Sequence, residues 1–134
     1  MTNTMSWPKQ VVLPLRIGRN AYVDNGSPCC AVGHFLHQLR YKTKLKQNYA
    51  LLNAATPELT VLEGVYKALY AALFGETYRS QLPTVERIND RINTKDRRTL
   101  YLLTWAKLGY TEGMPKRILN LLQDTRVQAV TVPI

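Results

Sequence analysis

The segment 60-TVLEGVYKALYAALF-74 lies near the middle of the chain and is apolar on nearly every side. Two helix-opening patterns stand at its start, Thr56-Pro57-Glu58 and Thr60-x-x-Glu63, and Gly75 is a natural C-terminal stop. A helix that is apolar all round is usually buried in the centre of a small domain. We therefore expect 60–74 to form the central helix, with the rest of the chain packed around it.

Four other segments have apolar residues at helical spacing: about 29–41, 84–92, 95–108 and 115–123. We expect Ser27 to cap the first of them and Thr94 to cap the third. Gly64 lies inside the central helix, where it is about 1 kcal/mol less favourable than alanine. It therefore predicts a close crossing with one of these neighbours. The domain thus has about five helices.

Two segments near the chain ends alternate apolar and polar residues as strands do. Pro14 interrupts the first, 10–17, which restricts that strand to a sheet edge or a bulge. The second is 126–134, and we expect the two to pair. Asp24-Asn25-Gly26-Ser27 is typical of a turn. The prediction is a single domain over 1–134, with 1–9 as a flexible arm. Its class is α+β and mainly α-helical, with about five helices around a buried central helix and a small terminal two-stranded sheet.

The chain carries a large positive charge. Among its 134 residues, 18 Lys and Arg oppose 9 Asp and Glu, which gives a formal net charge of +9 and a pI of about 9.8. A charge of this size attracts nucleic acid, acidic proteins or anionic membranes and says nothing about the fold. The segment 61–74 contains Glu63 and Lys67 and is too short to span a bilayer, and 1–10 shows no secretory pattern. We therefore expect a cytoplasmic protein without a membrane partner.

Three clusters hold the basic residues that we expect to contact a nucleic acid or an acidic partner: Arg40, Lys42, Lys44 and Lys46; Arg87, Arg91, Lys95, Arg97 and Arg98; and Lys116 with Arg117. The first is the most one-sided, because no acidic residue occurs between Asn25 and Pro57. Tyr41 and Tyr49 flank its lysines, as stacking on a single-stranded nucleic acid requires, although tyrosines also fill cores.

Two adjacent cysteines, Cys29 and Cys30, stand at the start of the helix predicted for 29–41. Neighbouring cysteines do not easily reach ordinary disulfide geometry, so we expect free thiols in a reducing compartment. At 100° per residue, Cys30, His34, His37 and Tyr41 fall on one stripe opposite the apolar face. Because a helix N-terminus favours a thiolate, Cys30 is the chemically more interesting thiol.

Three interpretations of this stripe are open. In the first, Cys30 is a nucleophile and His34 its base; papain-like enzymes also place a cysteine at a helix start, but their histidine comes from a distant segment. In the second, Cys30 and His34 bind zinc with ligands from outside the chain, since the sequence has no second Cys or His pair. In the third, the stripe is structural or part of a binding surface. The third is the simplest, so we predict no catalytic residue, no metal and no cofactor.

The stretch 102-LLTWAKLGYTEGMPKRILNLL-122 has the order of a helix-turn-helix: a helix, a glycine-containing turn and a second helix with Lys116 and Arg117. The turn, 109–114, is long for that motif. The second helix adds only Asn120 and Gln123 as further side chains that could read bases. DNA-binding regulation by this segment is an alternative function.

The stretch 26-GSPCCAVG-33 is similar to a pattern in small uncharacterised phage and prophage proteins, which carry Cys-Cys-x-x-Gly at a helix start after a polar, glycine-containing turn. A later amphipathic helix near their C-terminus resembles 118–122 here. The Asn-Asp pair that often precedes that helix is missing at the matching place, and Asn89-Asp90 lies farther upstream. The resemblance implies a phage context and no assigned activity. Small phage proteins often bind and block a host machine, sometimes a nucleic-acid-guided one.

These observations predict a small, basic, non-enzymatic binding protein of phage type. Its partner would be nucleic acid or an acidic surface of a host protein or nucleoprotein complex, with inhibition of a host defence or nucleic-acid machine as the result. The rival functions are a cysteine-dependent hydrolase or transferase that uses Cys30 and His34, and a helix-turn-helix regulator built on 102–122.

Overall fold

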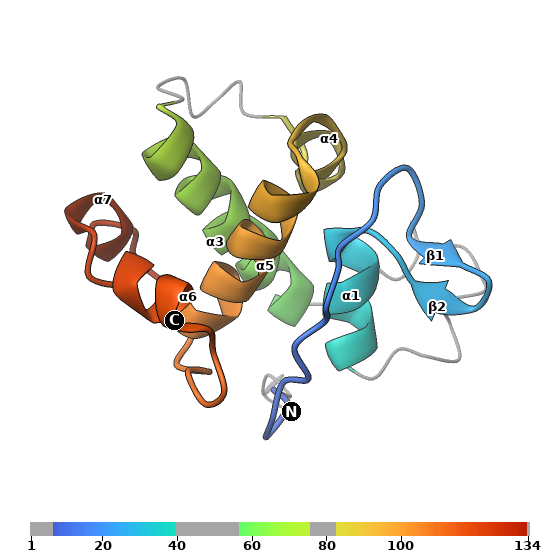
Figure 1. The fold of residues 1–134 in the computed structure, drawn as a ribbon, viewed down its shortest axis with the longest axis horizontal. Helices are drawn as coiled ribbons and strands as arrows, with labels where there is room; N and C mark the ends of the chain where they lie inside the picture. Colours follow the sequence, from blue (N-terminus) through green and yellow to red (C-terminus); the bar gives the residue numbers. More distant parts are fainter. Residues whose placement is uncertain (1–6, 40–56, 76–82, 134) are drawn as a thin grey trace.

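The structure is a computed structural model that describes residues 7–39, 57–75 and 83–133 (Figure 1). Two short strands and six helices follow one another in these residues: β1 (Val23–Asp24), β2 (Ser27–Pro28), α1 (Ala31–Gln38), α3 (Pro57–Phe74), α4 (Val85–Arg91), α5 (Thr94–Lys107), α6 (Lys116–Leu121) and α7 (Thr125–Gln128). The mainly helical α+β class is therefore confirmed. None of these helices is both long enough and apolar enough to cross a membrane.

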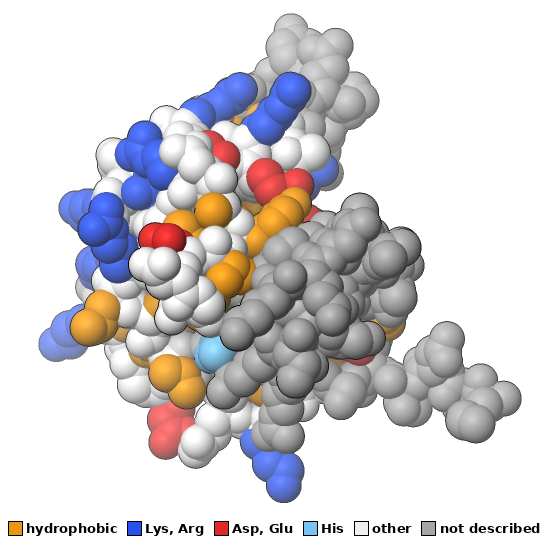
Figure 2. Space-filling view, turned by 90° about the vertical axis from the view of Figure 1, so that its right-hand side faces the viewer, with side chains coloured by type: hydrophobic (Ala, Val, Ile, Leu, Met, Phe, Trp, Pro, Cys, Tyr) orange, Lys and Arg blue, Asp and Glu red, His pale blue; other side chains and the backbone are white. Residues whose placement is uncertain are grey.

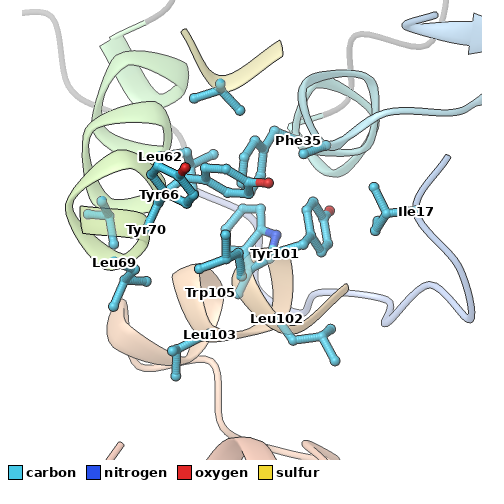
Figure 3. Close-up of a cluster of buried hydrophobic side chains, with 14 of the residues drawn as sticks. Ile17, Phe35, Leu62, Tyr66, Leu69, Tyr70, Tyr101, Leu102, Leu103 and Trp105 are labelled. Atoms are coloured by element: carbon cyan, nitrogen blue, oxygen red, sulfur yellow. The ribbon is translucent and has the colours of Figure 1, made fainter. Parts of the chain in front are cut away.

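The central helix is α3, as its apolar sequence predicts. It packs most extensively against α5 and also contacts α1, α4 and α7. Figure 3 shows Leu62 and Tyr66 of α3 in one cluster with Tyr101 and Trp105 of α5. From α1, the Phe35 ring stacks on Tyr101 with centroids 4.7 Å apart and meets Trp105 edge to face at 5.9 Å. Each aromatic pair adds about 0.5–1.5 kcal/mol of stability beyond the effect of burying its surface. This cluster therefore stabilises the packing of α1, α3 and α5.

Polar caps and one glycine set the helix boundaries. The Thr84 hydroxyl accepts a hydrogen bond from the Arg87 amide in the first turn of α4, at the start of the helix predicted over 84–92. Asn93, rather than Thr94, caps α5, and its side-chain oxygen lies 2.8 Å from the amide that it accepts from. After α3 the chain turns at Gly75, whose φ of 75° is in the left-handed region that favours glycine. The end of α3 and the start of α4 are thus confirmed, and α5 begins one residue earlier than predicted.

Residues 7–20, named the strap here, run along the outside of the helices (Figure 1). Hydrogen bonds from side chains of the helices hold the strap in place. The bonds join the Val12 main chain to Gln38, the Pro14 carbonyl to Arg98, the Ile17 carbonyl to Arg97, the Gly18 carbonyl to Asn89, and the Asn20 amide to Asp90. The Ile17 side chain is fully buried. The strap is therefore docked by side chains from α1, α4 and α5.

The predicted pairing of the two chain ends is wrong. Pro14 has no amide hydrogen, and the Gln38 side chain takes both the N–H and the C=O of Val12, which a neighbouring strand would need. At the other end, Asp124 caps α7, and Val127 of that helix is buried. Over so few residues the alternation of the C-terminal segment was compatible with a short helix.

The small sheet is instead a hairpin of β1 and β2, paired in the register Val23–Pro28 and Asp24–Ser27. Asn25 and Gly26 form its turn with φ values of 50° and 78°. Two positive φ values are characteristic of a type I′ turn, which favours Asn-Gly. The turn predicted at 24–27 is confirmed, but Ser27 belongs to β2 and does not cap a helix.

The first described residues are packed against the core. Trp7 meets Trp105 edge to face with ring centroids 6.4 Å apart, and the Tyr110 hydroxyl donates to the Pro8 carbonyl. Trp7 and Pro8 therefore do not belong to the flexible arm expected over 1–9, of which 1–6 lie outside the described residues. The strap is anchored from its first described residue onward.

Gly33 and Gly64 are a matched pair for testing how the hairpin packs on α1. A Cβ on Gly33 would overlap the Tyr22 carbonyl oxygen, whereas a Cβ on Gly64 would meet no atom within 4 Å. Gly64 therefore marks no close helix crossing, contrary to expectation. We predict that Gly33→Ala lowers the free energy of unfolding by about 2 kcal/mol or more, and that Gly64→Ala raises it by about 0.5–1 kcal/mol. Urea unfolding measures both changes, and a neutral Gly33→Ala would contradict the close approach.

Candidate functional site

Cys30 stands at the start of α1 in a different setting from the one expected. It precedes the first helical residue with φ −77° and ψ 174°, and its amide donates to the Ala21 carbonyl at 2.9 Å. Only 3% of its surface is exposed, whereas Cys29 is half-buried. The predicted stripe of Cys30, His34, His37 and Tyr41 is therefore wrong at its first member, and its last member, Tyr41, lies outside the described residues. The extended backbone at Cys30 breaks the 100° rotation on which the stripe depends.

His34 is a packing residue. Its ring meets Tyr101 edge to face with centroids 5.6 Å apart. Burial, assisted by the charge of His37, lowers the pKa of His34 to about 4. A histidine with so low a pKa is neutral and a weak base near neutral pH. This geometry supports a structural role for His34.

A pocket of about 270 Å³ opens beside the Cys30 thiol, and its other lining residues include Tyr22, Glu86 and Asp90. Within the described ranges this lining has two carboxylates and no imidazole. Burial raises the pKa of the Cys30 thiol to about 11, and the charge of Asp90 contributes in the same direction. A nucleophilic cysteine needs the opposite, a lowered pKa. The hydrolase alternative therefore lacks an activated thiol here. No three His, Cys, Asp or Glu side chains of the described segments converge as metal ligands would.

Asn89 and Asp90 of α4 join three parts of the fold, and sequence reasoning assigned them no role. The fully buried Asn89 side chain donates to the Gly18 carbonyl at 2.9 Å and accepts from the Ala31 amide, at the start of α1, at 3.1 Å. Asp90 accepts from the Asn20 amide at 2.9 Å. One sequence signal could have identified them: an asparagine lies inside a short predicted helix, although asparagine is unfavourable in helix interiors.

The basic residues predicted as contacts differ in burial, and some of them lie outside the described residues. Arg40, Lys42, Lys44 and Lys46 lie outside the described residues. Arg87, Arg91, Lys95 and Lys116 are exposed, and Arg98 and Arg117 are half-buried. Arg97 is a correction to the predicted set, because it is 1% exposed. Its guanidinium donates to the carbonyls of Ile17 and Ile92 and to the Thr94 hydroxyl.

Two arginines outside the predicted clusters, Arg16 and Arg19, are exposed on the strap. The Arg97 side chain bonds the carbonyl of Ile17, which lies between them, at 2.9 Å. Burial, followed by the charges of Arg19 and Arg16, lowers the pKa of Arg97. No local pattern marks these two arginines, because the fold brings them to a helix that starts far along the chain.

Arg16, Arg19, Lys95, Arg98 and Arg117 are named the cationic face here. Arg98 Nε donates to the Pro14 carbonyl at 2.8 Å, which places this guanidinium two residues from Arg16. Burial and the charge of Arg117 lower the pKa of Arg98. Lys95 and Arg98 are one turn apart on α5 and so share its surface. Figure 2 shows Lys and Arg side chains gathered along the left and upper edges of the view.

The cationic face is not neutralised by ion pairs within the segments that the structure describes. The salt bridge found in these segments joins Arg126 to Asp124 at 2.8 Å, at the start of α7. Arg98 donates to a main-chain carbonyl, and Arg117 donates to the Thr99 hydroxyl. Because both acceptors are neutral, the face keeps its positive charge.

A pocket of about 490 Å³ between α3 and α4 contains carboxylates, in contrast to the cationic face. Glu63, Glu86 and Lys67 line it. Burial and the charge of Glu86 raise the pKa of Glu63 to about 7, while Lys67 acts in the other direction. The Tyr22 hydroxyl donates to Glu86 at 3.4 Å. Lys67 thus lies beside the Glu63 carboxylate.

Helices α5 and α6 pack against each other, as the helix-turn-helix alternative expects. However, α6 has six residues and ends at Leu121, shorter than the helix predicted over 115–123. Arg117 turns back to Thr99 of α5, which leaves Lys116 and Asn120 as the exposed polar side chains of α6. A recognition helix reads bases with three or four side chains, so the cationic face offers the more extensive contact.

We predict that thiol reagents modify Cys29 of the folded protein much faster than Cys30. The Cys30 thiol is buried, and with a pKa of about 11 roughly one thiol in a thousand is ionised at pH 8. Iodoacetamide labelling of Cys29→Ser and Cys30→Ser, followed by mass spectrometry, measures each thiol separately. Urea should remove most of the difference. Faster labelling of Cys30 than of Cys29 in the folded state would contradict its buried setting.

His34 gives the stability a defined pH dependence. Its pKa is about 4 in the fold and about 6.5 in the unfolded chain. Between about pH 6.5 and pH 4, His34 is protonated in the unfolded chain and neutral in the folded chain. The free energy of unfolding therefore decreases as the pH is lowered from about 6.5 to about 4. In His34→Gln the decline should be weaker in urea titrations at successive pH values. An identical decline would show that His34 does not cause it.

Comparison of the chain with protein-family models, with curated proteins and with solved structures finds no match. The similarity of 26–33 to a pattern in phage proteins therefore stays an expectation from the sequence. The functional argument rests on the placement and chemistry of the residues described above.

Proposed function

We propose that this protein is a non-enzymatic binding protein whose cationic face engages a polyanionic partner. The partner is a nucleic acid or an acidic surface of a host protein or nucleoprotein complex. One observation carries the proposal: the strap, α5 and α6 bring five cations together without a carboxylate ion pair among the described residues. The net charge of +9 supports it, because long-range attraction accelerates association with anions.

Four of these five cations are arginines, which suits contact with an oxyanion. A guanidinium has five N–H donors in a planar fork that matches phosphate or carboxylate in a bidentate manner. Arg98 uses Nε toward the strap, and Arg117 uses one Nη toward Thr99. Both keep donors on their other nitrogens. These internal bonds also order the guanidinium groups before a ligand arrives, which reduces the entropy lost on binding.

Binding rather than catalysis is supported by the setting of Cys30, which is buried, protonated at neutral pH and bordered by carboxylates. The resemblance of 26–33 to a pattern in phage proteins adds the proposed setting: the partner belongs to a host cell, and binding blocks a host defence or nucleic-acid machine. This setting depends on the resemblance alone, and the cationic face does not depend on it.

The double variant Arg16→Gln/Arg19→Gln tests the cationic face. We predict that its affinity for a single-stranded oligonucleotide and for polyglutamate falls by about tenfold or more, because two ion contacts are removed while the main-chain bonds of the strap remain. Fluorescence anisotropy from about 50 to about 300 mM salt gives the affinities. The slope of log affinity against log salt should weaken by about 1–2 for the oligonucleotide.

Lys67→Gln/Arg126→Gln is the matched control, because it removes two cations that lie beside carboxylates. Its affinities should stay close to those of the unchanged protein. Equal losses in the two double variants would show that net charge alone drives binding. If the unchanged protein binds neither probe, or if salt leaves binding unaltered, the proposed function is wrong.

A further inference from the structure

The strap presents two aliphatic side chains to solvent. Leu15 is 93% exposed and Val12 is 75% exposed, more than any other large hydrophobic side chain of the described residues. Phe74 follows at 43%, and its ring stacks on Tyr70. Single exposed apolar residues are ordinary on protein surfaces. The surroundings of Leu15 and Val12 therefore decide what their exposure means.

Two arginines lie close to Leu15. Arg16 follows it in the chain, and Arg98 donates to the carbonyl of Pro14, the residue before it, at 2.8 Å. Leu15 thus lies next to members of the cationic face. Arginine is enriched where proteins meet other proteins, and the centres of such interfaces are apolar.

A groove of about 450 Å³ lies beside Val12. Residues 9–13 of the strap form one wall, and 109–113, which connect α5 to α6, form the other. Tyr110 and the half-buried Val11 and Leu13 give the lining an apolar part. Val12 therefore lies next to a hollow that can accept a side chain of a partner, and Leu15 follows two residues beyond the lining.

The strap is fixed before any partner arrives. Gln38 bonds both the N–H and the C=O of Val12, Arg98 bonds the Pro14 carbonyl, and Ile17 is fully buried. A preordered surface loses little conformational entropy on binding. Leu15 is thus displayed from a rigid support.

We infer that the strap is a docking surface for an acidic protein with an apolar recess. Leu15 enters the recess, and Arg16, Arg19 and Arg98 pair with the carboxylates around it. This inference rests on the proposed function and selects one of its two partner classes. A nucleic acid offers phosphates to arginines and flat bases to aromatic side chains, whereas a protein surface offers recesses that take an aliphatic side chain.

A displayed library of random peptides, selected against the full chain, tests this docking surface, with a single-stranded oligonucleotide as the second probe. We expect enriched peptides to combine Asp or Glu with Leu, Phe or Trp. Their affinity, measured by fluorescence anisotropy, should fall about tenfold or more in Leu15→Ser, because burial of a leucine side chain is lost. Arg16→Gln/Arg19→Gln should weaken the same peptides.

Phe74→Ser is the matched control, since it removes an exposed apolar side chain outside the strap. It should leave peptide affinity unchanged, and Leu15→Ser should leave oligonucleotide affinity unchanged. Circular dichroism should show the same helix content in Leu15→Ser as in the unchanged chain, because the side chain of Leu15 is 93% exposed and loses little packing.

Each remaining outcome decides between the two proposals. Peptides that lack acidic residues, or that bind Leu15→Ser as tightly as the unchanged chain, overturn the docking surface and leave the cationic face standing. Salt-dependent oligonucleotide binding without any enriched peptide assigns the face to nucleic acid. Absence of binding to every polyanion overturns the proposed function itself.

Discussion

Two buried polar side chains, Asn89 and Arg97, hold the strap on the helical core, and the other features of the structure depend on this attachment. Asn89 links the Gly18 carbonyl to the first amide of α1, and Arg97 links the carbonyls of Ile17 and Ile92. Buried main-chain groups are destabilising unless they are hydrogen-bonded. These two side chains supply the partners that an extended segment without a neighbouring strand would otherwise lack.

The same attachment explains why the Cys30 thiol is buried and why Arg16 and Arg19 are exposed. With Gly18 held by Asn89, the following chain turns through the hairpin and closes over α1, so that Cys30 is buried next to the Ala21 carbonyl. With Ile17 held by Arg97, the arginines on either side of it stay at the surface near α5. A single local arrangement thus buries the thiol and keeps these arginines at the surface.

Much of the helical frame was predictable, because it depends on local signals. The apolar segment 60–74 predicts the central helix, Gly75 predicts its end, and Thr84 predicts the start of α4. The strap was not predictable in the same way. Alternation over 10–17 indicates an extended chain, but it does not show that the side chain of Gln38 replaces a neighbouring strand.

The candidate site was harder to predict, because neighbouring residues of the same type differ in burial. Arg97 and Arg98 are adjacent and chemically alike, yet one is enclosed in the core and the other lies in the cationic face. Consecutive helical residues are rotated by 100°, so the two side chains point in different directions. A count of charges along the sequence does not distinguish them. Cys30 shows the same difficulty, since its extended backbone places it before the first helical residue and helical spacing does not describe its side chain.

The cationic face is assembled from distant parts of the sequence, with 84 positions between Pro14 and the Arg98 side chain that bonds it. Its geometry therefore exists in the native state and is lost on denaturation. Any ligand that requires this geometry is linked to the folding equilibrium, and at a hundred times its dissociation constant it contributes about 2.7 kcal/mol to the native state. A partner that reads the face thus acts as a thermal stabiliser as well, and the melting temperature becomes a function of its concentration.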